Sequence, residues 1–190
     1  TVRQSIEDDG THIVELEGEA VLTAADVVVP RDPSSAAFPM VAALITEGSD
    51  LLIPGVGMNP LRTGLITTLQ DMGGQIEIAN ERTEGGETVA DLRVRHSQLH
   101  GIDVPPARAA SMIDEYPILA VAATQAEGDT RMRGVAELRV KETDRIGVVA
   151  EGILAAGGTV TYDEDSMTVT GGQIAGGMNI DSQHDHRIAM

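Results

Sequence analysis

The chain has 190 residues, of which 42% are hydrophobic, enough for a packed core in one large domain or two small ones. A net charge of −17 argues against binding to nucleic acid or to anionic membranes, and the absence of cysteine excludes disulfides and thiolate metal sites. No apolar stretch is long enough to cross a membrane, and no basic region followed by an apolar one opens the sequence, so we expect a cytoplasmic protein.

The first half of the chain predicts an alternation of strands and helices. Residues 12–17 alternate apolar and polar side chains, which predicts a half-buried strand. Asp32-Pro33-Ser34-Ser35 is a turn and helix-start signal, and the apolar residues 36–45 after it predict a helix buried on all sides. The elements expected next are a strand at 51–53, a helix at 62–72 and strands at 75–78 and 89–95.

The same order of elements recurs in the second half. Tyr116-Pro117-Ile118 echoes Phe38-Pro39-Met40, and a glycine pair ends the second helix of each half, at 73–74 and at 157–158. The second half predicts a helix at 116–123, a strand at 130–133, a helix at 142–156 and strands at 159–162 and 167–170. A third copy is expected to begin at 184–187 with the first turn of another buried helix, so we expect an internal piece of a longer protein.

The strongest candidate for chemistry is the basic segment 139–145. It holds Lys141, the only lysine of the chain, beside Arg139 and Arg145. On a helix, Lys141 and Arg145 occupy positions i and i+4 and project to one side, near the positive end of that helix. The segment therefore indicates an anion site, and a solvated helix start with ordinary ion pairs is the alternative.

Two further segments place charged groups at helix starts. Asp114 stands before the apolar helix expected at 116–123, where a carboxylate either caps the helix or acts as a base. His184-Asp185-His186-Arg187 could suggest a metal site, but no other cluster at ligand spacing accompanies it, so we expect no metal. An arginine such as Arg187 is better suited to hold a carboxylate or a phosphate.

Two other motifs carry less weight. The segment Asp32-Pro33-Ser34-Ser35 could bind a phosphate or cap the helix that follows, and its sequence fits both roles equally well. Gly55-Val56-Gly57 lacks the third glycine and the helix of a dinucleotide-binding loop, so we do not expect such a loop there.

Several segments together, in family order, resemble the 5-enolpyruvylshikimate-3-phosphate (EPSP) synthase family. They are 32–38, 113–117, 141–145 and 185–190. The first two, with 59–65, are most similar to the bacterial class known for glyphosate-tolerant members, and the resemblance covers essentially the whole chain. It implies a transferase of the shikimate pathway that moves the enolpyruvyl group of phosphoenolpyruvate to the 5-hydroxyl of shikimate 3-phosphate, with no metal or organic cofactor.

The resemblance also implies the fold. The family fold is an α/β (α+β) arrangement of inside-out β/α repeats, in which buried helices are covered by four-stranded mixed sheets. The chain is expected to hold two full repeats of a three-repeat domain: 1–28 as end strands of the preceding domain, 29–102 as the first unit, 103–178 as the second, and 179–190 as the start of a truncated third. The complete protein is expected to be a monomer, whereas this piece would expose apolar helix faces and self-associate.

Three residues match the catalytic groups of the family. Asp114 matches the acid that hydrogen-bonds the shikimate hydroxyls and is taken as the proton acceptor. Lys141 matches the lysine near that hydroxyl, and Glu142 matches the residue implicated in protonating and deprotonating the pyruvyl methylene. The chemistry is reasonable, because addition of an alcohol to an enol phosphate needs an acid for carbon and a base for oxygen.

Three more residues match the substrate-binding groups. Arg145 and Arg187 match two arginines that grip phosphoenolpyruvate, and His186 is expected close to the same site. The resemblance departs at Glu137, where one family subtype has an asparagine, so that family contact is not expected here.

The rest of the family site is absent from the sequence. The lysine-serine phosphate site, the glycine-rich loop with an arginine, and the serine-glutamine pair for shikimate phosphate all lie upstream of Thr1 in family order. We therefore expect this chain alone to be inactive. Two alternatives stay open at this point: a UDP-N-acetylglucosamine enolpyruvyl transferase fragment, which shares fold and cosubstrate, and a noncatalytic anion-binding scaffold domain.

Overall fold

The computed structural model describes residues 2–19, 21–172 and 174–190. The expected segments 1–28 and 103–178 contain residues 1, 20 and 173, which lie outside the described residues, and the expected boundaries stay predictions. The elements in chain order are β1 (Val2–Ile6), β2 (His12–Leu16), α1 (Pro33–Ile45), β3 (Asp50–Gly57), α2 (Gly64–Asp71), β4 (Gln75–Glu84), β5 (Glu87–Arg95), β6 (Asp103–Val104), the 3-10 helices η1 (Pro106–Ser111) and η2 (Ile113–Glu115), α3 (Tyr116–Thr124), β7 (Asp129–Arg133), the 3-10 helix η3 (Ala136–Val140), α4 (Arg145–Ala155), β8 (Thr159–Tyr162), β9 (Ser166–Thr170) and α5 (His186–Ala189).

The predicted recurrence of elements is confirmed, because α1–β3–α2–β4–β5 is followed by the same order in α3–β7–α4–β8–β9. Helix α1 begins as its sequence indicates: Asp32 is the N-cap, and its carboxylate accepts hydrogen bonds from the backbone N–H groups of Ser34 and Ser35. The prediction that residues 36–45 are buried on all sides is wrong, because Pro39 and Ala42 of α1 are exposed. In the second unit, every residue of α3 except Val121 is buried.

The two sheets differ in completeness. The second unit has the expected four-stranded mixed sheet, in the order β6-β7-β9-β8, with β6 parallel to β7. In the described part of the first unit the sheet has three antiparallel strands, β3-β5-β4, and the fourth place is taken by a single parallel bridge between Arg31 and Val56. Val56 belongs to the Gly55-Val56-Gly57 motif, which lies within β3 and opens no helix.

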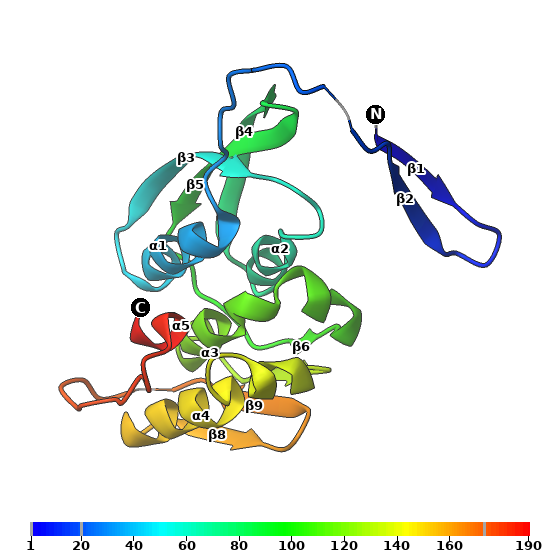
Figure 1. Ribbon diagram of the computed structural model, residues 1–190. Coiled ribbons are helices and arrows are strands. Elements are labelled where there is room, and N and C mark those ends of the chain that lie inside the picture. The colour runs from blue at the N-terminus through cyan, green and yellow to red at the C-terminus, as the bar shows by residue number, and fades with distance from the viewer. Residues whose placement is uncertain (1, 20, 173) are drawn as a thin grey trace.

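The helices lie in the middle of the molecule and the sheets lie outside them (Figure 1). Helix α1 packs against α3, so the two units share one hydrophobic core. Leu44 of α1 and Leu119 of α3 have no exposed surface, and Leu92 of β5 and Val169 of β9 close the core from the two sheets. This is the inside-out α/β arrangement expected from the sequence.

The first strand expected from the sequence is present but is not half-buried. It is β2, which pairs antiparallel with β1, and its side chains are exposed except for that of Ile13, which is partly covered. The hairpin stands apart from the two units (Figure 1). Alternation of apolar and polar residues predicts the strand correctly, but burial also needs a surface to pack against.

The last helix, α5, returns to the helix layer beside α3 and α4. The sequence indicates a buried helix here, but no residue of α5 is buried, and Ile188 is partly covered by the core. Among the described residues, no helix is both long and apolar enough to cross a membrane.

Candidate active site

Asp114 does not cap the helix that it precedes. It lies in η2, which leads directly into α3, and neither helix has a side-chain cap hydrogen bond. Its Oδ1 instead accepts a hydrogen bond from Arg145 Nη1 at 2.9 Å and lies 3.9 Å from Lys141 Nζ. The sequence left two roles open for Asp114, a helix cap and a base. The structure shows no capping contact, and the carboxylate is paired with other charged groups instead.

The helix expected at 142–156 begins three residues later, at Arg145. Asp144 is its N-cap and accepts a hydrogen bond from the Gly147 N–H at 3.2 Å. Lys141 lies before the helix in an extended conformation, so the prediction that Lys141 and Arg145 share one helix face at i and i+4 is wrong. The bend between them, rather than helical spacing, brings both cations to Asp114.

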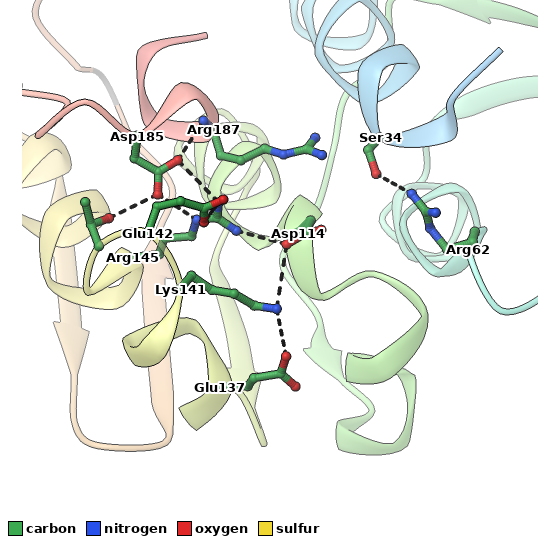
Figure 2. Close-up of polar contacts among 10 residues, drawn as sticks. Ser34, Arg62, Asp114, Glu137, Lys141, Glu142, Arg145, Asp185 and Arg187 are labelled. Carbon is green, nitrogen blue, oxygen red and sulfur yellow. Dashed lines mark hydrogen bonds and ion pairs between the residues drawn. The ribbon is translucent and has the colours of Figure 1, made fainter.

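Arg145 is the centre of the site (Figure 2). Its side chain is only 1% exposed and binds three carboxylates: Nη1 donates to Asp114 at 2.9 Å, Nη2 to Glu142 at 2.6 Å, and Nε to Asp185 at 2.8 Å. Nη2 also donates to the second oxygen of Asp185 at 3.3 Å, so this pair is bidentate. A planar guanidinium with five fixed donors suits this fork-shaped contact in a way that lysine does not.

Asp185 is the fixed, buried partner of this arrangement. It has no exposed surface, and besides Arg145 it accepts hydrogen bonds from the Thr143 hydroxyl at 3.1 Å and the Arg187 N–H at 2.8 Å. Burial by itself raises the pKa of Asp185, but the hydrogen bonds from Arg145 and the Arg187 backbone outweigh it and hold the pKa below its usual range. Burial lowers the pKa of Arg145, but the carboxylates of Asp185, Glu142 and Asp114 together outweigh it and hold the pKa above its ordinary value.

Lys141 lies between two carboxylates. Its Nζ is 2.7 Å from Glu137 Oε1 and 3.9 Å from Asp114 Oδ1. Glu137 is the position at which the sequence departs from one family subtype, and here it holds the lysine by an exposed contact one turn away. Glu137 is therefore the hydrogen-bond partner of the lysine, and Asp114 lies at the far limit of an ion pair with it.

Arg187 and His186 have different surroundings at the start of α5. The Arg187 side chain extends away from Asp185 toward the side of the site that carries Ser34 and Arg62 (Figure 2). His186 is exposed and, in the described part of the chain, takes no part in the contacts of Arg145, so its expected place near the site stays a prediction. No group of three or more His, Cys, Asp or Glu side chains among the described residues is arranged to hold a metal ion.

Sequence reasoning missed four residues that the fold brings to this place. Asp185 was noted only as part of a histidine-rich motif, and Glu115 as a neighbour of Asp114. Ser34 accepts a hydrogen bond from Arg62 Nη2 at 2.9 Å, on the first unit. The pairing of Arg145 with a residue 40 positions away has no local signal, because it depends on how α4 and α5 pack.

The whole chain matches one protein family. The sequence model described as EPSP synthase (3-phosphoshikimate 1-carboxyvinyltransferase) matches residues 2–190. This chain belongs to the EPSP synthase family. The expected motifs of EPSP synthase, which the sequence places at 113–117, 141–145 and 185–190, are the segments that meet at Arg145.

Individual relatives agree with the family match. The chain is 61% identical over 192 residues to the 3-phosphoshikimate 1-carboxyvinyltransferase of Methylorubrum extorquens, covering 100% of this chain and 42% of the relative. It is 57% identical to the protein of that name from Parvibaculum lavamentivorans, over 95% of this chain and 41% of the relative. A solved structure of EPSP synthase from Acinetobacter baumannii matches with a TM-score of 0.90 and 44% identity, over 98% of this chain and 43% of that one.

The chain thus spans about two fifths of the length of the EPSP synthase relatives that it matches. The structural match confirms the expected α/β fold of the EPSP synthase family. Neither alternative left open by the sequence, the UDP-N-acetylglucosamine enzyme or the anion-binding scaffold, finds support in these comparisons.

Proposed function

We propose that this chain supplies one wall of the active site of an enzyme that transfers the enolpyruvyl group of phosphoenolpyruvate to the 5-hydroxyl of shikimate 3-phosphate, releasing phosphate. The observation that carries the proposal is the convergence of Asp114, Glu142 and Asp185 on Arg145, through contacts of 2.6–2.9 Å, with Lys141 Nζ 3.9 Å from Asp114. Three motifs that lie apart in the sequence would have no reason to meet here if each only capped its own helix.

The arrangement provides the groups that this reaction needs. Asp114 is 38% exposed and acts as the base that accepts the proton of the attacking hydroxyl, with Lys141 beside it to hold the anionic substrate. Glu142 is 54% exposed and acts on the methylene carbon, first giving a proton and then taking one back when phosphate leaves. Cations around two anionic substrates offset their mutual repulsion and stabilise the charge that develops between them.

The contacts also indicate how Arg145 takes part. Asp185 is its buried, fixed partner, whereas Asp114 and Glu142 are its exposed ones. We propose that phosphoenolpyruvate replaces one of the two exposed carboxylates on Arg145 when it binds, which frees that carboxylate for proton transfer. Arg187, whose side chain extends into the same space, is the second arginine for this substrate (Figure 2).

The test is a chimera in which this chain replaces the matching segment of the Methylorubrum extorquens relative. Phosphate release is measured with both substrates. The chimera is expected to turn over, and Asp114→Asn is expected to lower kcat by about 10²-fold or more, as loss of a general base does. Asp103→Asn, which changes an exposed carboxylate paired with Arg133, is the matched control and is expected to keep full activity.

A chimera that melts like the relative but releases no phosphate contradicts the proposed function. This chain alone is expected to release no phosphate, because it spans about two fifths of its relatives. Clear turnover by the chain alone would show that the other segments of the family site are not needed.

A further inference from the structure

Glu115 is a buried carboxyl group next to the site that the proposed mechanism does not use. It is only 4% exposed, and its Oε1 has no hydrogen-bond partner among the described residues. An ionised carboxylate in that position loses its bound water, and hydrogen bonds from the protein do not fully replace it. The carboxylate then either stays ionised at a cost of several kcal/mol or has its pKa raised and becomes neutral. The group therefore favours its neutral form more than an exposed glutamate does.

The polar and charged groups around Glu115 come from three elements and one loop. The Ser34 hydroxyl lies on α1, Arg62 lies just before α2, Asp114 precedes it on η2, and Arg187 lies on α5. Burial is the largest influence and raises the pKa of Glu115. Asp114 raises it further, while the Ser34 hydroxyl and the two arginines act to lower it. Lys141 and Arg145 are paired with other carboxylates instead.

Arg187 differs from the other cations around the site in its ion pairs. Arg62, Lys141 and Arg145 each lie within 3.2 Å of a carboxylate oxygen, on Asp32, Glu137 and Asp114 among others. The Arg187 side chain has no such ion pair among the described residues, and Figure 2 shows it pointing toward Ser34 and Arg62 of the first unit. An ionised Glu115 would be the carboxylate that competes with a bound anion for this charge.

We propose that Glu115 is a positioning residue of the phosphoenolpyruvate site, which takes up a proton when the anion binds and thereby leaves the charge of Arg187 to the anion. The proposal rests on the function proposed above. An anion placed beside Arg187 adds a second negative charge near Glu115, which favours the protonated carboxyl. Binding of the anion and protonation of Glu115 are then linked. In the pH range where Glu115 is ionised in the free protein and protonated in the complex, the affinity for the anion falls as the pH rises.

The test is calorimetric titration of phosphoenolpyruvate into the chimera described above, in buffers of different ionisation enthalpy, between pH 5 and pH 8. The phosphate group of the ligand also titrates, so the readout is the difference between the parent chimera and its Glu115→Gln variant. The parent is expected to take up as much as one more proton than the variant. In the pH range where this proton is taken up, the Kd of the parent is expected to rise with pH more steeply than the Kd of the variant, by up to about tenfold per pH unit. Glu151→Gln, which makes the same change at an exposed position of α4, is expected to behave like the parent.

Equal proton uptake in the parent and in Glu115→Gln, or no binding by the parent, overturns the proposal. If Glu115→Gln fails to fold, Ser34→Ala serves instead: removing the hydroxyl that lowers the pKa of Glu115 is expected to move the window to higher pH, and an unmoved window overturns the proposal. Phosphate release by the same preparation reports on the proposed function separately. Turnover with equal proton uptake contradicts the role of Glu115 alone, whereas absence of turnover contradicts the function.

Discussion

Replacing Asp185 by asparagine removes one charge from the most buried ion pair of the site and keeps the shape of the side chain. Asp185 has no exposed surface and Arg145 is 1% exposed, so the change leaves a buried guanidinium with less compensation. Removing one partner of a buried pair costs about 3–5 kcal/mol. Arg145 retains Asp114 and Glu142, which places the expected loss at the lower end, about 3 kcal/mol.

Asparagine is also a good N-cap, so the contact of this side chain with the Arg187 N–H is retained and the variant isolates the loss of charge. For a chain of this length, about 3 kcal/mol corresponds to a decrease in Tm of about 6–12 °C. Urea and thermal unfolding of the chain measure both quantities. Asp181→Asn, at an exposed turn in the same segment, is the control and is expected to change stability by less than about 0.5 kcal/mol.

The pH dependence gives a second check on the same reasoning. The pKa of Asp185 is lowered in the folded state, so its contribution is present above the ordinary value of 3.8 and is lost as the pH falls through the folded value. The stabilities of the parent and Asp185→Asn are therefore expected to converge in acid. A difference below about 0.5 kcal/mol at pH 7, or one that grows in acid, would refute the account of this ion pair.

Three further changes test the packing and the buried acid. Gly171→Ala places its Cβ on a backbone carbonyl oxygen and is expected to cost about 1–3 kcal/mol or more in urea unfolding, whereas Gly172→Ala, with nothing within 4 Å, is expected to be nearly neutral. Leu119→Ala removes a fully buried side chain and is expected to cost about 2–5 kcal/mol, against about 1 kcal/mol for the half-exposed Val121→Ala; equal losses would contradict the core assignment. Because the pKa of Glu115 is raised in the folded state, its contribution to stability falls as the pH rises above 4.5. Thermal melts are therefore expected to show the Tm of Glu115→Gln increasing relative to that of the parent from pH 4 to pH 7. The opposite trend would exclude a raised pKa.

Much of the fold follows from local signals. The spacing of apolar residues and the glycines at the ends of elements predict the helices and strands of both units, because helices and strands depend on residues a few positions apart. The same signals are less exact at helix starts. Asp144 caps α4 and shifts its beginning to Arg145, although Glu142 is an equally acceptable helix residue by propensity.

The sequence by itself also determined which residue types stand at the site, since the charged motifs around Asp114, Lys141 and Arg187 are visible without any coordinates. Only the tertiary structure decided their pairing. Arg145 reaches Asp114 over 31 positions and Asp185 over 40, and no local rule selects one carboxylate among the 30 acidic residues of the chain. Burial likewise separates Glu115 from its neighbour Asp114, because it depends on the packing of α1 against η2 rather than on the residue itself.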